Sequence, residues 1–276
     1  MAIQIAVASG KGGTGKTTVA SNLFHSINTY KTRGALLVDC DVEEPNAKLF
    51  FQESKALART TIDQEIPHID IPSCTFCRKC ADFCEFNAIV VIPPAGFAEI
   101  NPSLCHSCGA CLVACPSNAI HIQSEPIGTS TMYEDQNGNR LLEGRLKIGS
   151  AMQTMVIRTL KQSIPHHENM VILDAPPGSS CPVVETMADA DYVVLVSEPT
   201  PFGLHDLKLM LALVRKMGKS HGVVVNKANL GNRDLYDYLE EEQVEILGEI
   251  PFSRSYASQY SKADLFSETP SEVQAA

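Results

Sequence analysis

The sequence predicts an α/β protein with a mostly parallel sheet, interrupted by a small inserted α+β module. Uninterrupted apolar runs, which are typical of strands buried on both faces of a parallel sheet, alternate with segments of helical periodicity. This alternation stops between Cys74 and Cys115, where eight of the ten cysteines are crowded together. We therefore expect one sheet domain in two parts, residues 1–62 and 127–276, and an inserted module at residues 63–126.

A phosphate-binding loop is predicted near the N-terminus. An apolar run at residues 3–8 and a helical pattern at residues 16–29 enclose a G-x-x-x-x-G-K-[ST] motif. Its glycines let backbone N–H groups surround an anion, and the following helix N-terminus favours negative charge. Lys16 would reach the β- and γ-phosphates, and the Thr17 hydroxyl would bind Mg²⁺. A purely structural loop is the alternative. The residues expected to bind nucleotide here are Gly10, Lys11, Gly12, Gly13, Thr14, Gly15, Lys16, Thr17 and Thr18.

The rest of the chain continues the alternation of strands and helices. Strands are predicted at residues 35–38, 170–173, 192–196, 223–225 and 246–250, and helices at residues 148–164, 204–214 and 235–242. Polar residues end the strands at Asp39, Asp41, Asp174, Glu198 and Asn226. Ligands of parallel sheets bind at the carboxyl ends of strands, so we expect these side chains to share one site. The alternative for the aspartates and for Asn226 is an ordinary polar strand end.

The cysteine-rich segment contains a repeat with an offset of 31 residues, and each copy reads C-x₂-C-x₂-C-x₃-C. This spacing is typical of two-cluster ferredoxins, in which the fourth cysteine of each run ligates the other cluster. We therefore expect two [4Fe-4S] clusters. The expected ligands are Cys74, Cys77, Cys80 and Cys115 for one cluster, and Cys105, Cys108, Cys111 and Cys84 for the other. A pair of zinc sites is the alternative, but zinc has no need of a third and fourth cysteine at these offsets.

Composition excludes several classes of function. The net charge of −10 makes a broad nucleic-acid-binding surface unexpected. No apolar run approaches the roughly 20 residues of a membrane-spanning helix. The N-terminus has no basic segment before its first apolar run, so no signal peptide is expected. The sequence thus predicts a cytoplasmic protein that binds neither nucleic acid nor membrane.

The segment Lys11–Thr17, read with the acidic strand ends, resembles the deviant Walker A motif K-G-G-x-G-K-T of the MinD/ParA/Mrp group of P-loop ATPases. The cysteine module after the second strand resembles the ferredoxin domain inserted in some MinD-like members. Further similarity lies in the segments Leu173–Gly178 and Val196–Pro201 and in Val225-Asn226-Lys227. The resemblance covers nearly the whole chain and implies a P-loop NTPase fold of the SIMIBI class.

The resemblance also implies roles for individual residues. Lys11 would cross to the phosphates of the other subunit in an ATP-bound dimer and, with Lys16, stabilise transition-state charge. Asp41 would orient the attacking water, Asp39 would support Mg²⁺ and its loop, and Asp174 would act on Mg²⁺ through water. Gly178 would sense the γ-phosphate. Asn226 and the backbone near Pro251 would contact adenine, and the absence of a following N-K-x-D aspartate favours ATP over GTP.

Three functions remain open from the sequence. The first is an ATPase, acting as a homodimer or homologous heterodimer, in which nucleotide state controls electron transfer or partner docking by the two clusters. The second is a carrier or scaffold that delivers clusters to an acceptor protein, as in the Mrp group. The third is a ParA- or MinD-type positioning ATPase, against which the acidic charge argues. The redox or acceptor partner is not identified by the sequence.

Overall fold

The computed structural model describes residues 2–30 and 34–265, and these residues form two compact units. The sheet unit comprises Met1–Thr60, Thr129–Arg145 and Gln153–Ala276, and the cysteine unit comprises Thr61–Gly128 and Leu146–Met152. Within the described residues, no helix is long and apolar enough to cross a membrane.

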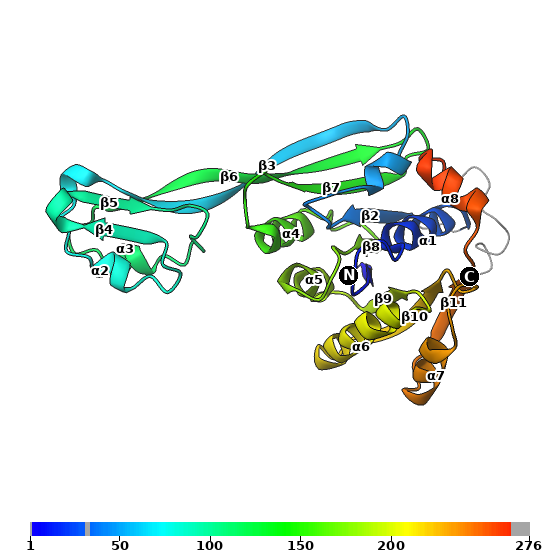
Figure 1. The fold of residues 1–276 in the computed structure, drawn as a ribbon. Helices are drawn as coiled ribbons and strands as arrows, with labels where there is room; N and C mark the ends of the chain where they lie inside the picture. The colour runs from blue at the N-terminus through cyan, green and yellow to red at the C-terminus, as the bar shows by residue number, and fades with distance from the viewer. Residues whose placement is uncertain (1, 31–33, 266–276) are drawn as a thin grey trace. The chain divides into compact units, whose positions relative to one another are not determined.

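The sheet unit is built on a mostly parallel sheet, as the sequence predicts (Figure 1). In the described part of the chain the sheet has nine strands in the order β11-β10-β9-β1-β8-β2-β7-β6-β3. Their bounds are β1 Ile3–Ala8, β2 Ala35–Asp39, β3 Lys55–Ile69, β6 Ile120–Glu134, β7 Arg140–Leu146, β8 Met170–Asp174, β9 Tyr192–Ser197, β10 Ser220–Asn226 and β11 Ile246–Ile250. The unit boundaries fall within β3 and β6 and near the end of β7.

Register brings the acidic strand ends together. β8 pairs in parallel with both β1 and β2, with Asp174 opposite Val7 on one side and Asp39 on the other. β2 also pairs in parallel with β7, which places Glu143 opposite Asp39. The carboxyl ends of β1, β8 and β2 therefore meet at one edge of the sheet, with Glu143 from the middle of β7 beside them, as expected for a parallel α/β fold.

Helices cover the sheet because its central strands are apolar on both faces. The helices of this unit are α1 Lys16–Tyr30, α4 Gln153–Gln162, α5 Cys181–Met187, α6 Pro201–Lys216, α7 Asp234–Glu241 and α8 Arg254–Ser261, with a 3₁₀ turn η1 at Ala47–Phe50. Ile172 of β8 packs in one core cluster with Val19 and Phe24 of α1 and Tyr256 of α8. Its fully buried neighbour Leu173 points to the opposite face, because side chains alternate along a strand.

The fold contains a hairpin in the sheet unit and differs from the sequence prediction at one helix. The turn Asp135–Asn139 joins β6 and β7 as a hairpin, with the Asp135 N–H donating to Asn139 O at 3.0 Å. The helix predicted from residue 148 begins instead at Gln153. The reason is a turn before it, in which Gly149 has a φ of +85° and the Ser150 N–H donates to Lys147 O at 3.0 Å.

The cysteine unit is built from short elements around a small core of its own. These are η2 Ile71–Ser73, α2 Lys79–Asp82, β4 Ile89–Ile92, η3 Pro93–Ala95, β5 Phe97–Ile100 and α3 Ala110–Ala114, together with the adjoining parts of β3 and β6. β4 and β5 form an antiparallel hairpin. The core contains Ile66, Ile69, Ala88, Ile100 and Ile120 with several of the cysteines.

The sequence repeat is reproduced in the backbone of this unit. Left-handed residues recur 31 positions apart, as Phe76 and Ser107, Arg78 and Gly109, and Asn87 and Asn118. The two copies also exchange equivalent hydrogen bonds: Asn101 N–H donates to Ala88 O at 2.8 Å, and Asp70 N–H donates to Ala119 O at 2.7 Å. The unit thus consists of two halves of matching conformation.

Candidate functional site

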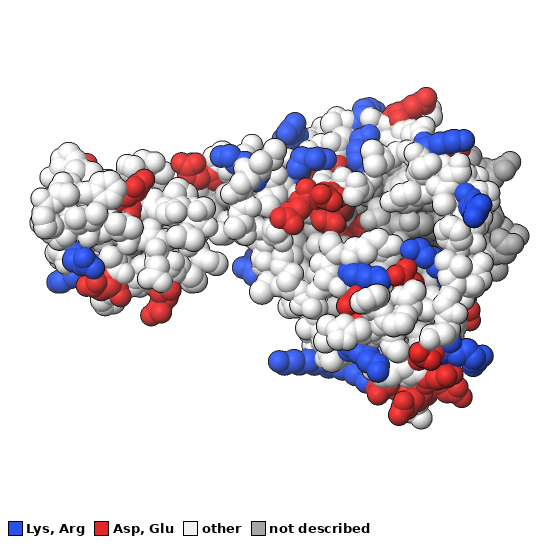
Figure 2. Space-filling model, viewed as in Figure 1, with Lys and Arg blue, Asp and Glu red and all other residues white. Residues whose placement is uncertain are grey.

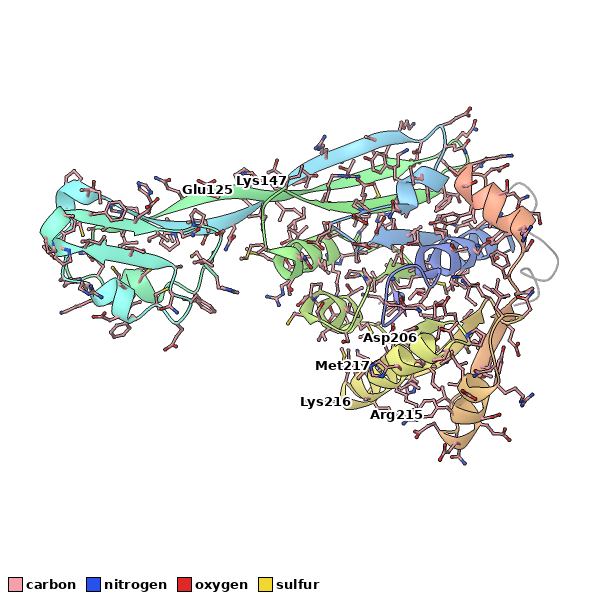
Figure 3. All side chains as sticks on the ribbon, in the orientation of Figure 1. Glu125, Lys147, Asp206, Arg215, Lys216 and Met217 are labelled. Carbon is pink, nitrogen blue, oxygen red and sulfur yellow. The ribbon has the colours of Figure 1, made fainter. Side chains whose placement is uncertain are left out.

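The glycine-rich loop between β1 and α1 is held closely by two neighbouring elements. Gly13 and Gly15 have φ values of +77° and +95°, which glycine adopts readily. A Cβ on Gly15 would lie 2.4 Å from Asn226 Nδ2. A Cβ on Gly10 would lie 2.6 Å from Cβ of Asp206, which is labelled on α6 in Figure 3. Both positions therefore require glycine, and the loop retains the tight shape of an anion-binding turn.

Lys16 begins α1 directly behind this loop. Its side chain is buried, and burial lowers the pKa of its ammonium against the opposing influence of Asp174 and Asp41. The ammonium lies 3.5 Å from Lys11 O. A bound phosphate would supply the counter-charge that a buried ammonium needs.

Asp174, at the end of β8, provides the clearest position for a cation. Its side chain is almost fully buried, and among the described residues no hydrogen bond of normal geometry reaches either carboxylate oxygen. Burial raises its pKa to about 7, against the lowering influence of the Thr17 hydroxyl and Lys16. An unpartnered buried carboxylate beside a threonine hydroxyl fits Mg²⁺, which prefers oxygen ligands.

The neighbouring aspartates hold the loop that follows β2. The Asp39 carboxylate accepts hydrogen bonds from the Asp41 N–H at 3.1 Å and from the Ala47 N–H at 2.9 Å. Burial and the nearby Asp174 raise the pKa of Asp39. Burial also raises the pKa of the half-buried Asp41, against a backbone hydrogen bond at Glu44 and the charge of Lys16. Asp39 thus fixes the loop on which Asp41 faces Lys16.

Glu198 bridges two lysines, Lys11 and Lys227. The sequence predicted Glu198 only as a polar strand end and gave it no role. Glu198 Oε1 lies 2.5 Å from Lys11 Nζ, and its Oε2 lies 3.0 Å from Lys227 Nζ. Burial would raise the pKa of Glu198, but the hydrogen bonds from both lysines outweigh it and lower the pKa. The only sequence signal for this contact was that Glu198 and Lys227 each follow a predicted strand.

The residues expected near the base are partly engaged in holding loops. Asn226 Nδ2 donates to Thr14 O at 2.7 Å, and Asn226 Oδ1 accepts from the Lys227 N–H at 2.9 Å. Asn229 Oδ1 accepts from the Phe252 N–H at 2.6 Å, next to Pro251. Adenine contact by Asn226 and Pro251 stays a prediction, whereas the contact of Asn226 with the phosphate-binding loop is direct.

The loop after β8 is tied to the same site. Gly178 has a φ of +96°, and its N–H donates to Ser9 O at 3.1 Å. Ser9 directly precedes the phosphate-binding loop. A change in the conformation of that loop would therefore reach Gly178 through this hydrogen bond.

The eight clustered cysteines line two separate cavities of the cysteine unit. The first cavity is lined by Cys74, Cys77, Cys80 and Cys115. The second cavity is lined by Cys84, Cys105, Cys108 and Cys111. Each cavity therefore combines three cysteines of one repeat with the fourth cysteine of the other. The remaining two cysteines, buried Cys40 and exposed Cys181, line neither cavity.

Backbone N–H groups point at the sulfurs in the same way in both copies. Phe76 N–H donates to Cys74 Sγ at 3.4 Å, and Ser107 N–H donates to Cys105 Sγ at 3.4 Å. Cys84 and Cys115 accept from the N–H groups of Ala88 and Ala119, at 3.4 and 3.3 Å. N–H donors at these positions would stabilise the negative charge of a metal-bound sulfur.

The pKa shifts of the clustered cysteine thiols are unequal. Burial raises the pKa of Cys80 and raises that of Cys111 to about 11. Burial also acts upward on Cys115, but the Ser117 hydroxyl and neighbouring N–H groups outweigh it, so the pKa of Cys115 is lowered. Within residues 2–30 and 34–265, no three His, Cys, Asp or Glu side chains converge as ligands of a single ion. A [4Fe-4S] cluster instead requires four thiolates around one volume.

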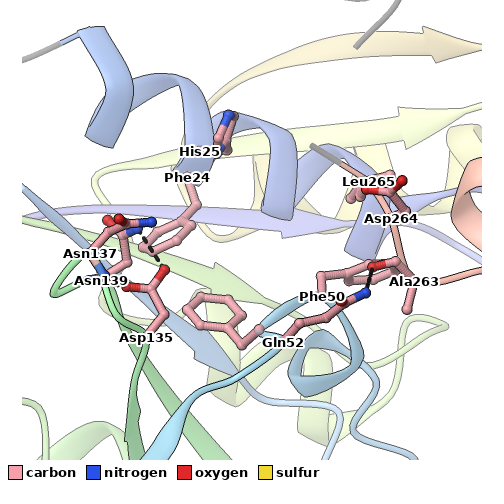
Figure 4. Close-up of a pocket in the computed structure, with 11 residues that line it drawn as sticks. Phe24, His25, Phe50, Gln52, Asp135, Asn137, Asn139, Ala263, Asp264 and Leu265 are labelled. Carbon is pink, nitrogen blue, oxygen red and sulfur yellow. Dashed lines mark hydrogen bonds between the residues drawn. The ribbon is translucent and has the colours of Figure 1, made fainter. Parts of the chain in front are cut away.

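A further cavity, of about 210 Å³, lies elsewhere in the sheet unit (Figure 4). Phe24 and His25 of α1 line it together with Phe50, Gln52 and Asp135. Gln52 Nε2 donates to Ala263 O at 2.9 Å at its rim. None of the residues predicted to bind nucleotide, Mg²⁺ or iron lines this cavity.

Comparison with known proteins gives one family. Residues 5–266 match the model described as the CobQ/CobB/MinD/ParA nucleotide binding domain. Uncharacterized protein MJ0578 of Methanocaldococcus jannaschii is 32% identical over 233 residues, covering 83% of this chain and 80% of that protein. The cell division ATPase MinD of Pyrococcus furiosus shares the fold, with a TM-score of 0.56 and 18% identity over 100% of this chain and 95% of that one.

A shorter match concerns a different class of protein. The ferredoxin-type protein NapF of Escherichia coli strain K12 is 43% identical over 47 residues. This match covers 16% of the present chain and 29% of NapF.

Proposed function

This chain belongs to the CobQ/CobB/MinD/ParA nucleotide-binding family, and on that premise we propose that it is a dimerising ATPase whose nucleotide state controls two [4Fe-4S] clusters. Depending on the bound nucleotide, the clusters would transfer electrons to a partner protein, or the cysteine unit would dock with that partner. The observation that carries the proposal is the crossed arrangement of cysteines, in which each cavity takes three from one repeat and one from the other.

ATP binding is supported by the glycine-rich loop and its surroundings. Backbone N–H groups of the loop and the ammonium of Lys16 would hold the phosphates. Thr17 and Asp174 would hold Mg²⁺, which neutralises charge that develops on the phosphates. Asp39 would support this position by fixing the loop through the Asp41 and Ala47 N–H groups.

Hydrolysis requires a positioned water and a further positive charge. Asp41 is half-buried and faces Lys16, so its carboxylate would accept a hydrogen bond from the attacking water. Lys11 would supply the further charge to a second copy of the chain. In the described structure Lys11 is instead bound to Glu198 of its own chain. We therefore expect a change of partner for Lys11 when two copies close around ATP.

The cysteine unit supports the second half of the proposal. The eight cysteines provide four thiolates to each cavity, which is the number that a [4Fe-4S] cluster requires. Such a cluster would supply a one-electron redox centre. The chain's own contribution is to hold the thiolates, to donate N–H groups to four sulfurs, and to shield both cavities with Ile69, Ile89, Ile100 and Ile120.

A route from nucleotide to clusters is supported by the packing beside Asp41. Val42 follows Asp41 and packs so closely on β7 that a Cβ on Gly144 would lie 2.8 Å from Val42 Cγ1. β7 continues through Leu146, and the chain then forms residues 146–152 of the cysteine unit, where the Lys147 N–H donates to Ile127 O at 2.8 Å. A shift at Asp41 and Val42 would therefore pass along β7.

Anaerobic reconstitution of the full chain tests the clusters. Two [4Fe-4S] clusters predict about eight iron and eight sulfide per chain and a reducible electron paramagnetic resonance (EPR) signal. With crossed ligation, Cys115→Ser disturbs the cluster held by Cys74, Cys77 and Cys80, whereas Cys84→Ser disturbs the other. Cys181→Ser is the control. A chain that binds about two zinc ions and no iron would contradict the proposal.

The ATPase half has a separate test. Lys11→Ala should leave ATP binding intact and remove most of the turnover, because it affects charge in the transition state. Mixing Lys11→Ala with a binding-deficient Lys16→Ala chain should restore part of the turnover if Lys11 acts across the dimer. Unchanged turnover in Lys11→Ala would contradict the dimer model.

A further inference from the structure

The two cysteine cavities are built from equivalent positions of the 31-residue repeat, but three of these positions differ in chemistry. Thr75, Arg78 and Ser117 line the first cavity, where His106, Gly109 and Phe86 line the second. Resting on the function proposed above, we propose that the cluster held by Cys74, Cys77, Cys80 and Cys115 has the higher reduction potential and receives the first electron.

The main difference between the two cavities is the positive charge of Arg78 in the first. Arg78 adopts a φ of +65° where the equivalent Gly109 has +74°. Left-handed backbone costs a non-glycine residue roughly 1–2 kcal/mol, so glycine would be the more stable choice at Arg78. The guanidinium donates to Val91 O at 3.4 Å, and Val91 also lines the first cavity. A positive charge there stabilises the more negative, reduced cluster, and no such charge exists at Gly109.

Ser117 adds a hydrogen bond in the same cavity. Its Oγ lies 3.6 Å from Cys115 Sγ. The equivalent of Ser117 in the other copy is Phe86, which has no donor and stacks on His106 with ring centroids 4.0 Å apart. Hydrogen bonds to ligand sulfur stabilise the reduced state of a cluster. The backbone N–H bonds to sulfur match between the copies, so the difference lies in the side chains.

One carboxylate beside a ligand cysteine favours this asymmetry, whereas Asp70, which stands where the other copy has Asn101, acts against it in the first half. Glu85 directly follows Cys84, a ligand in the second cavity, whereas its equivalent Pro116 is uncharged. A carboxylate there disfavours reduction of the second cluster. On α2, Lys79 and Asp82 carry opposite charges and line neither cavity. Figure 2 shows few charged side chains on the visible face of the cysteine unit, so each of them matters for the local potential.

The electron balance is simple. A one-electron donor such as dithionite reduces one cluster core from 2+ to 1+, and the donor is oxidised by one electron. At equilibrium this electron would reside in the first cavity, where Arg78 and Ser117 would stabilise the added negative charge. No covalent bond or proton is exchanged in this step.

An exchange of residues between the two copies tests the proposal. Arg78→Gly removes the charge and suits the backbone, and Gly109→Arg adds a charge at the matching position. The nearest side-chain atom to a Cβ on Gly109 is Leu112 Cδ1 at 3.9 Å, so there is room for the substitution. The measurement is an EPR-monitored redox titration of the reconstituted full chain, carried out at one fixed pH for all variants. Lys79→Ala is the charge control.

We expect two separate midpoint potentials in the unmodified chain. Arg78→Gly and Ser117→Ala should each lower the higher potential only, Gly109→Arg should raise the lower one, and Lys79→Ala should shift both slightly. Equal potentials in the unmodified chain, or an Arg78→Gly shift no larger than that of Lys79→Ala, would overturn the inference while leaving the proposed function intact. A reconstituted chain without iron would overturn both.

Discussion

The ammonium of Lys11 lies 2.5 Å from the carboxylate of Glu198 in the same chain. Lys227 binds the other oxygen of this carboxylate at 3.0 Å, so Glu198 holds two lysines at the edge of the phosphate-binding loop. If Lys11 acts on the nucleotide of a second copy, this ion pair must break when the dimer closes. Glu198 would therefore oppose closure in the absence of nucleotide.

Glu198→Gln is expected to favour the ATP-bound dimer. The substitution keeps the shape of the side chain and removes its charge, and a partly exposed ion pair is worth about 1 kcal/mol. Each of the two copies loses one such pair on closure, so the dimer dissociation constant should fall by up to about thirtyfold. Analytical ultracentrifugation with a non-hydrolysable ATP analogue measures the change. The control is Glu185→Gln, which removes a 2.8 Å ion pair between Glu185 of α5 and Arg158 of α4. Weaker dimerisation of Glu198→Gln would contradict this role.

Asp174 is expected to make the Mg²⁺-free protein less stable as pH rises. Its folded-state pKa of about 7 lies above the value of about 3.9 in an unfolded chain. Between these values the folded protein keeps a proton that the unfolded chain has released. Its contribution is therefore most favourable below pH 4 and is lost as pH rises to 7, by up to about 1.4 kcal/mol per pH unit.

Thermal unfolding in EDTA at pH 5 and pH 7.5 checks this dependence. The loss of stability should be smaller in Asp174→Asn and unchanged in the exposed control Asp237→Asn. Mg²⁺ should restore stability at pH 7.5 in the unmodified chain and in Asp237→Asn, but not in Asp174→Asn. Identical pH profiles for the unmodified chain and Asp174→Asn would refute the assignment.

Gln64 is expected to support the second cluster selectively. Its buried side chain donates from Nε2 to Cys105 O at 2.8 Å and to Ser107 Oγ at 2.9 Å. Gln64→Leu keeps the volume and leaves these acceptors without a donor, at a cost of about 1–3 kcal/mol. Iron content should fall from about eight toward about four per chain. Gln136→Leu, at an exposed turn, should retain all the iron. Equal loss of both EPR signals in Gln64→Leu would contradict selectivity.

Val42 is expected to couple the nucleotide to the cysteine unit. Val42→Ala removes the two methyl groups of a buried side chain that packs against Gly144 and should cost about 1–3 kcal/mol of stability. ATP binding should persist, while the effect of ATP on the clusters should weaken. Val113→Ala, at a residue 91% exposed, should change neither property. An undiminished ATP effect in Val42→Ala would show that coupling takes another route.

Much of the fold could be predicted from local patterns. The bounds of β1 and β11 follow from apolar runs, and the α/β alternation determines the parallel sheet. The beginning of α4 could not be predicted in this way, because residues 148–152 have helix-compatible composition but form turns at Gly149 and Ser150.

The two candidate sites also differ in how much of each could be predicted from the sequence. Motif spacing indicated which cysteines belong together, since the crossed pattern is a property of the repeat. The Glu198 bridge joins residues 187 positions apart in the chain, so only the fold reveals it. The contact of Asn226 with Thr14 is likewise a product of strand order, which places β10 near the loop after β1. Pairwise contacts between distant strand ends have no local signal.

The most direct test of ATP control over the clusters is the rate at which dithionite reduces the reconstituted full chain with and without MgATP, followed by stopped-flow absorbance. We expect MgATP to change this reduction rate in the unmodified chain and to have no effect on it in Lys16→Ala. Equal rates with and without MgATP, in a chain that hydrolyses ATP and carries about eight iron, would contradict ATP control of the clusters.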